Sequence, residues 1–376
     1  MIQHSHRADV ERLLEWFAAN GRRLPWRTAG RRDPYQVWIA EVMLQQTRVP
    51  TVIPYFQRFL CLFPDVPALA RAELDAVLKA WEGLGYYARA RHAHSAARLM
   101  VERHAGRVPA ERDALLALPG IGAYIAHAIL SLAFGQDYLA LDANGRRVLA
   151  RWMGLERPLR ERGAESALRA FGEALLPAGR AGAFNEALMD LSSLVCTPKS
   201  PACGVCPIRE SCQAHLQGRQ EQIPARVPRR QVPHYDVSAA VIWQDGKVLL
   251  AQRLEGGMLG GLWEFPGGTR EAGESLEECL RREIQEELGM EIAVGEHLIS
   301  VSHAYTHKRI TLHAFHCRPL RGTPQKLEVK DWRWVAPAEV LQYPLSVVDQ
   351  RVAEALLSWL RENGSHVEPA PARPAD

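Results

Sequence analysis

The sequence predicts a chain of two domains, an all-α domain followed by an α+β domain. First, a chain of 376 residues is long enough for two hydrophobic cores. Second, helical periodicity fills residues 1–218, whereas short apolar runs typical of strands begin near residue 234. Third, residues 219–233 between them are polar and basic and contain prolines, as expected of an interdomain linker.

The all-α prediction for residues 1–218 rests on repeated amphipathic segments separated by Gly, Pro and Asn. Helical periodicity is clearest in residues 10–20, 35–46, 74–84, 89–104 and 124–134. The second domain, residues 234–362, contains one strongly helical segment at 275–288 among the expected strands. These strands are expected at 235–244, 247–253, 297–305, 310–317 and 331–337. Residues 363–376 are rich in Pro and Ala, so we expect a disordered tail.

Composition gives only broad limits on function. Hydrophobic residues make up 47% and charged residues 24% of the chain, close to globular averages. No run of 18 apolar residues and no export signal is visible, so we expect a cytoplasmic protein without membrane contact. The net charge of +3 permits contact with a polyanion without requiring it. Two arginine clusters are either solvated surface or phosphate contacts: Arg22, Arg23, Arg27, Arg31 and Arg32, and Arg226, Arg229 and Arg230.

Four of the seven cysteines are crowded into residues 196–212 with the spacing C-x6-C-x2-C-x5-C. The four are Cys196, Cys203, Cys206 and Cys212. Four thiolates presented by one proline-containing loop suit either a zinc ion or an iron-sulfur cluster. The spacing resembles the [4Fe-4S] loop of the endonuclease III and MutY glycosylases at all four positions, which implies a cluster with a structural role.

The segment LPGIG, residues 118–122, lies between two helical stretches and carries Gly120 and Gly122. Glycines let this turn approach another molecule closely, and the N–H groups of the next helix form a phosphate site. Alone, the segment is equally typical of an ordinary helix-helix turn. Because Asp142 follows 20 residues after Gly122, the pattern resembles the helix-hairpin-helix and Asp signature of base-excision glycosylases.

Two carboxylates are candidates for hydrolytic removal of a purine, which needs a proton on the leaving base and negative charge near the sugar. Glu41 lies among apolar residues of a helix that starts at Asp33 and Pro34, which favours a raised pKa and an acid role. It is alternatively a structural ion-pair partner. Asp142, beside Asn144, suits the ionised role.

The resemblance to MutY-type adenine DNA glycosylases covers nearly all of residues 10–215. It is carried, in order, by LPWR at 24–27, DPYQVWIAEVMLQQTRV at 33–49, WEGLGYYARAR at 81–91, LPGIGAY at 118–124 and the cysteine loop. The resemblance implies that Glu41 protonates adenine and assists water, that Asp142 stabilises the sugar cation, and that Tyr124 and Asn144 support the same transition state. It implies lesion contacts for Gln46 and Thr47, and wedging of Leu84 and Tyr86 into the base stack.

Two positions qualify this resemblance. Tyr124 stands where glycosylases with lyase activity carry a lysine, so we expect little or no strand cleavage. The stretch LDANGRRV departs from the usual DGN followed by an apolar residue, which leaves the backbone path after Asp142 open.

The second domain contains GGTREAGESLEECLRREIQEELGM, which matches every fixed position of the Nudix box. Glu283, Glu286 and Glu287 would share one helix face and could gather Mg²⁺. The resemblance to MutY proteins implies instead a Nudix-like scaffold that recognises oxidised guanine. Within it, Tyr305, Thr306 and His307 match the lesion-reading loop, although surface residues of a strand are the plainer interpretation.

We therefore expect an enzyme that releases adenine mispaired with 8-oxoguanine or guanine in double-stranded DNA and that acts as a monomer. Two alternatives stay open at this point. The Nudix half could also hydrolyse oxidised nucleoside triphosphates, or the chain could bind lesions without catalysis.

Overall fold

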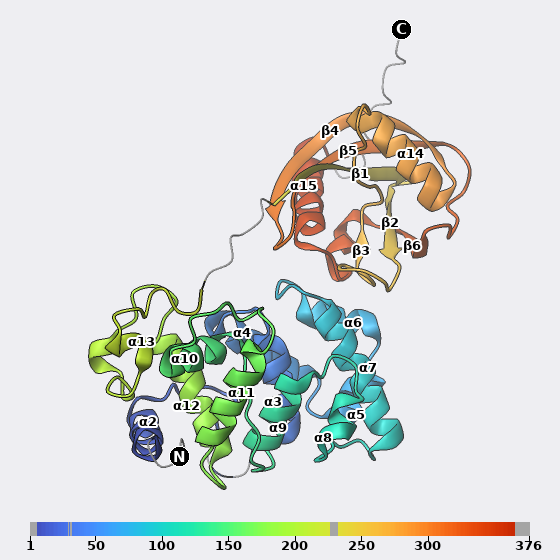
Figure 1. Cartoon of the computed structure of the whole chain (residues 1–376). Coiled ribbons are helices and arrows are strands. Elements are labelled where there is room, and N and C mark those ends of the chain that lie inside the picture. The colour runs from blue at the N-terminus through green and yellow to red at the C-terminus, as the bar shows by residue number, and fades with distance from the viewer. Residues whose placement is uncertain (1–5, 29, 31, 226–231, 365–376) are drawn as a thin grey trace. The chain divides into compact units, whose positions relative to one another are not determined.

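The computed structural model describes residues 6–364 except for 29, 31 and 226–231 (Figure 1). It divides into two compact units, one formed by Met1–Arg71 with His92–Arg229 and the other by Ala72–Arg91 with Arg230–Asp376. The boundary at Arg229 lies inside the predicted linker, part of which is outside the described residues. The segment Ala72–Arg91, in contrast, groups with the second unit although it interrupts the first in sequence.

The described part of the first unit contains helices and no strand. Its helices are α2 (Arg7–Asn20), α3 (Pro34–Leu44), α4 (Val49–Leu62), α5 (Val66–Arg71), α8 (Arg112–Leu116), α9 (Ala123–Leu132), α10 (Ala143–Met153), α11 (Ala164–Leu175), α12 (Ala181–Leu194), α13 (Gln213–Leu216) and the 3₁₀ turn η1 (Cys203–Val205). Helix α7 (Ala88–Arg103) begins in the second unit and continues into the first. The all-α prediction for this region is confirmed.

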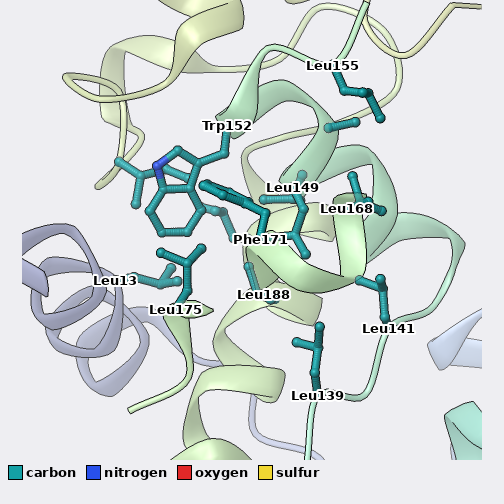
Figure 2. Close-up of a cluster of buried hydrophobic side chains, with 14 of the residues drawn as sticks. Leu13, Leu139, Leu141, Leu149, Trp152, Leu155, Leu168, Phe171, Leu175 and Leu188 are labelled. Atoms are coloured by element: carbon teal, nitrogen blue, oxygen red, sulfur yellow. The ribbon is translucent and has the colours of Figure 1, made fainter. Parts of the chain in front are cut away.

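One apolar core of the first unit fixes the start of α10. This core contains Trp152 and Leu149 of α10, Phe171 of α11 and Leu13 of α2, as Figure 2 shows. Leu139 and Leu141, from the extended segment before α10, point into the same core. Because Leu141 is buried, the next residue, Asp142, is held at the first turn of α10.

The second unit contains a mixed sheet covered on both faces by helices. Its strands are β1 (His234–Gln244), β2 (Lys247–Arg253), β3 (Trp263–Glu264), β4 (Glu291–Ala304), β5 (Arg309–Arg321) and β6 (Val329–Val335). The order is β3-β2-β1-β5-β4, with β6 also paired to β2, and only β1 and β5 run parallel among these named pairs. Helices α14 (Leu276–Leu288) and α15 (Val347–Asn363) pack in separate cores that use alternate residues of the strands.

The predicted helix at 275–288 is α14, whose N-terminus is closed by a capping box between Ser275 and Glu278. Helix α15 was not expected from the sequence, although Val348, Val352 and Leu356 recur at helical spacing and are buried. Strand β3, which is only two residues long, was not expected either. The short helix α6 (Leu74–Trp81) and the 3₁₀ helix η2 (Pro337–Gln342) complete the unit.

None of the helices in the described residues is long and apolar enough to cross a membrane.

Candidate active site and iron-sulfur loop

Glu41 lies on α3, and its carboxyl group is almost fully buried, with 4% of the residue exposed. Tyr124, in the first turn of α9, donates its hydroxyl hydrogen to Oε2 of Glu41 at 2.6 Å. Burial raises the pKa of Glu41 to about 7; the Tyr124 bond opposes this shift and the negative charge of Asp142 adds to it. Glu41 therefore carries a proton that it can donate near neutral pH.

Asp142 is the N-cap residue of α10, and its carboxylate accepts hydrogen bonds. Its Oδ1 accepts the backbone N–H of Gly145 at 2.6 Å, and its Oδ2 accepts a hydrogen bond from the exposed Asn144 amide at 3.1 Å. The N-terminal end of a helix stabilises negative charge, which suits an ionised carboxylate. A Cβ at position 145 would lie 3.2 Å from both Asp142 Oδ1 and Leu141, so the glycine permits this close cap. The departure from the usual DGN pattern thus leaves Asp142 and Asn144 together.

Glu41 lines a pocket within the first unit. One part of its wall is apolar and is formed by Trp26, Leu44, Val49 and Leu132. Another part is charged and is formed by Arg22, Arg27, Arg32 and Glu186. A pocket with apolar walls and a few fixed polar groups is typical of a small-molecule binding site. Of the residues that line this pocket, only Glu41 was expected from the sequence to be catalytic.

Arg22, Arg27 and Arg32 form ion pairs within the protein, so the interpretation of these three as solvated surface is wrong. Arg27 donates to both carboxylate oxygens of Asp190, at 2.7 and 2.9 Å. Arg22 also binds Asp190, and Arg32 forms a two-point ion pair with Glu186. Although burial alone raises the pKa of Asp190, the hydrogen bonds from Arg27 and Arg22 hold it below its usual value. Acidic partners 154 to 168 residues away in sequence decide the placement of these arginines.

The hairpin ahead of α9 has the predicted open geometry. Gly120 has a φ of +75°, and a Cβ there would lie 2.7 Å from Cβ of His92, so a side chain is excluded. Gly122 is the N-cap of α9, and apart from its chain neighbours no described atom lies within 4 Å of the position its Cβ would take. Phosphate binding by the first N–H groups of α9 stays a prediction.

Cys196, Cys203, Cys206 and Cys212 line one pocket, and all seven cysteines of the chain are described and free of disulfide bonds. Burial raises the pKa of Cys206 to about 12 and also raises that of Cys212. Arg151, which is buried, donates to Cys196 Sγ at 3.3 Å. Four thiols that line one pocket fit the sulfur ligands that an iron-sulfur cluster requires.

Gln46 and Thr47 lie in the turn after α3, where Gln46 is exposed with a φ of +58°. Leu84 and Tyr86 lie in the second unit, before α7. Tyr86 is 39% exposed, whereas Leu84 is only 5% exposed and would have to leave its buried position to enter a base stack. The roles of these four residues stay predictions.

Tyr305, Thr306 and His307 form the turn between β4 and β5, closed by a bond from Tyr305 N–H to Lys308 O at 2.8 Å. The Tyr305 ring packs on the core of the second unit and stacks with His307 at 6.5 Å between ring centroids. Thr306 is exposed, and its Oγ1 lies 2.5 Å from the hydroxyl of Tyr86 within the same unit. The structure thus brings the predicted wedge residue Tyr86 to the predicted lesion-reading loop.

The Nudix-box carboxylates are not arranged as one open metal site. Arg282 forms ion pairs with Glu274, Glu283 and Glu286. Burial raises the pKa of Glu287 to about 8, so that side chain is mainly uncharged near neutral pH. Hard divalent cations bind charged carboxylates, and none of the described carboxylates is grouped in threes to hold one. The structure gives no support for Mg²⁺ at Glu283, Glu286 and Glu287.

Family models match three parts of the chain. Residues 39–172 match the HhH-GPD superfamily of base excision DNA repair proteins, residues 196–212 the iron-sulfur binding domain of endonuclease III, and residues 238–355 a NUDIX domain. Together with the helical fold and the buried Glu41, these matches define a DNA N-glycosylase of the helix-hairpin-helix class, with an iron-sulfur loop and a Nudix-like second domain.

Individual relatives narrow this class. This chain is 33% identical to two proteins named adenine DNA glycosylase, from Rattus norvegicus and Homo sapiens. Each match covers 90% of this chain, and it covers 76% of the rat protein and 72% of the human protein. A solved thermostable thymine-DNA glycosylase is 29% identical and covers 57% of this chain and 97% of its own, with a TM-score of 0.51. The chain belongs to the adenine DNA glycosylase family.

Proposed function

We propose that this protein hydrolyses the N-glycosidic bond of adenine in duplex DNA, where the adenine is mispaired with 8-oxoguanine or with guanine. The hydrogen bond between Tyr124 and the buried Glu41 carries this proposal, because it holds a proton donor of pKa about 7 at the pocket. Family relatives that bear the name adenine DNA glycosylase support adenine as the base. We further infer that the chain works as a monomer in the cytoplasm.

In the proposed reaction, an adenine turned out of the duplex enters the pocket beside Glu41. Glu41 gives its proton to a ring nitrogen, and the bond between C1′ and the base breaks with its electron pair leaving on the base. Asp142 stabilises the positive charge that develops on the sugar, and Asn144 holds the Asp142 carboxylate in place. Glu41, now ionised, takes a proton from water as the hydroxyl group bonds to C1′.

Strand cleavage is not part of this proposal. Tyr124 occupies the place of a lysine in lyases, and its hydroxyl is bound to Glu41. A phenol cannot form a Schiff base with the sugar. The abasic product should stay uncut until alkali is added.

Recognition of the oxidised base is assigned to Tyr305, Thr306 and His307, because this turn presents a hydroxyl, a ring and an imidazole at one exposed end of a hairpin. Gly120 and Gly122 would bind a phosphate at the N-terminus of α9.

A [4Fe-4S] cluster bound by Cys196, Cys203, Cys206 and Cys212 would order the loop that carries Lys199 and Arg209. When bound, the cluster supplies four iron-thiolate bonds that cross-link residues 196–212. We assign it no step in the reaction. Nucleotide hydrolysis by the second unit is not proposed, since Arg282 pairs with the box carboxylates.

The test is a single-turnover assay with duplexes that place adenine opposite 8-oxoguanine, guanine or thymine. We expect free adenine from the first two, fastest with 8-oxoguanine, and loss of at least about 100-fold in Glu41→Gln and in Asp142→Asn. Glu102→Gln, an exposed carboxyl of α7, is the matched control. Undiminished release in both active-site variants would refute the assigned roles, and no release by the unmodified protein would refute the function.

A further inference from the structure

Two buried hydrogen-bond donors of the sheet are satisfied by a residue of α6. Trp263 of β3 is 1% exposed, and its indole Nε1 donates to Asp75 Oδ2 at 3.0 Å. Gln252 of β2 is 5% exposed, and its Nε2 donates to Asp75 Oδ1 at 3.0 Å and to Gly261 O. The two oxygens of one carboxylate therefore serve two strands, and a buried donor left without its acceptor is costly.

The residues around Asp75 extend this attachment. Lys79 donates to the carbonyl oxygens of Leu341 and Tyr343, at 2.6 and 3.1 Å. Glu82 accepts the backbone N–H of Leu345 at 2.9 Å. In these contacts Lys79 and Glu82 bind backbone groups, so the contacts depend on the path of the partner segment and not on its side chains. Asp75 differs from them because it is the acceptor for two buried side chains.

Farther along the same segment, Arg91 donates to the carbonyl oxygens of Gly260 and Gly257 at 2.6 and 2.8 Å. Gly261 has a φ of +78°, and a Cβ there would lie 3.3 Å from Leu78 of α6. The loop before β3 therefore follows α6 closely. All of these residues belong to the second unit.

This attachment decides where Tyr86 stands. Tyr86 lies between Glu82 and Arg91, both of which bind backbone groups of the same unit. Its backbone adopts a φ of +50°, uncommon for a residue with a large side chain. Its hydroxyl is 2.5 Å from Thr306 Oγ1 in the turn between β4 and β5. A shift of α6 against β2 and β3 would separate these two hydroxyls.

We propose that Asp75 is a positioning residue for the choice between 8-oxoguanine and guanine opposite the adenine. It fixes α6 on β2 and β3, and so keeps Tyr86 against Thr306 when the turn reads the opposite base. This inference rests on the proposed function, because it assumes that Tyr86 and Thr306 meet the lesion. Asp75 would act through Tyr86, because its own side chain binds Gln252 and Trp263.

Asp75→Asn is the sharpest variant, because it keeps the shape and removes one acceptor. An amide has one oxygen and two N–H donors, so one of the two donors of Trp263 and Gln252 then faces another donor. Glu73→Gln is the matched control, since Glu73 is the exposed N-cap residue of the same helix and makes no side-chain cap bond. Both variants lose one negative charge from α6.

The measurement is the single-turnover rate of adenine release opposite 8-oxoguanine divided by the rate opposite guanine. Because both rates scale with the folded fraction, a variant that merely folds poorly leaves this ratio unchanged. We expect Asp75→Asn to lower the ratio about tenfold, the size expected for one lost buried hydrogen bond. Glu73→Gln should leave the ratio as it is.

A double variant shows whether the effect comes from the hydrogen bond between Asp75 and Trp263 or from a general change in the structure. Trp263→Phe removes the donor that Asp75 serves, so the ratio in Asp75→Asn with Trp263→Phe should fall by less than the product of the two single effects. An unchanged ratio in Asp75→Asn, or fully multiplicative effects, would overturn the role of Asp75. An unmodified protein without preference for 8-oxoguanine would instead overturn the proposed function.

Discussion

Glu41 shows how the surroundings of one residue create an acid that works near neutral pH. An exposed glutamate is ionised at pH 7, but this side chain is enclosed by α3 and the residues around it. Its charge is further disfavoured by Asp142, while Tyr124 partly compensates by donating a hydrogen bond. The balance of these effects places the pKa at about 7.

The first prediction concerns the pH dependence of adenine release. Since the pKa of Glu41 is raised, its acid form is complete well below pH 7 and disappears as the pH rises through about 7. The single-turnover rate should therefore be highest on the acid side and fall about tenfold per pH unit above the pKa. A rate that rises between pH 6 and pH 8 would contradict the assignment of Glu41 as the acid.

The second prediction concerns Tyr124→Phe. The Tyr124 hydroxyl stabilises the ionised form of Glu41, so its removal should raise the pKa of Glu41. The falling limb of the pH profile should move to higher pH, with a lower maximum if the hydroxyl also assists the transition state. A shift of the limb to lower pH would show that burial of Glu41, and not the hydrogen bond, is what the substitution changes.

At the scale of elements, three helix ends converge on the catalytic groups. The first turn of α9 supplies Tyr124, the N-terminus of α10 is capped by Asp142, and α3 carries Glu41. Groups carried on helices are held more rigidly than groups carried on loops. The burial of Leu139 and Leu141 explains how the extended segment before α10 is fixed (Figure 2).

The third prediction concerns the cysteine loop. Cys206→Ser should abolish the visible absorbance of an iron-sulfur cluster and make residues 196–212 sensitive to proteolysis, because the cross-link at this loop is lost. Cys61→Ser, an exposed cysteine on α4, is the control and should keep the absorbance. Equal absorbance in both variants would exclude Cys206 as a ligand, and bound zinc in place of iron would exclude the cluster.

At the scale of the whole molecule, the chain joins a helical unit to a Nudix-like unit that contains a complete Nudix box. In this structure Arg282 links Glu274 to α14, and Glu283 lies against Gly268, where a Cβ would be 2.1 Å from its carboxyl carbon. These contacts form a joint between α14 and the loop before it.

The fourth prediction follows from this joint. With Mg²⁺ and 8-oxo-dGTP, the protein should release no pyrophosphate above background, because the carboxylates are paired with Arg282 or uncharged. Release that disappears in Glu286→Gln would show instead that nucleotide binding frees these groups and that the box is active.

Much of the fold was predictable because local signals agreed with it. Turn residues and periodicity marked the change from helices to strands, and the strands β1 and β2 were expected within one residue of their observed bounds. The grouping of Ala72–Arg91 with the second unit was not predictable, since its helical pattern does not show which core will cover it. The same holds for Arg22, Arg27 and Arg32, whose partners are far away in sequence.

The sequence by itself determined the family resemblance, the four-cysteine spacing, the hairpin glycines and the choice of Glu41 and Asp142 as candidate catalytic residues, because each depends on residue type at fixed spacing. Only the tertiary structure decided which groups become neutral, paired or exposed. The raised pKa of Glu41, the ion pairs that hold Arg27, and the attachment of Asp75 to Gln252 and Trp263 depend on burial and on contacts between distant segments. Free energies of burial and pairing depend on three-dimensional surroundings, which no local pattern specifies.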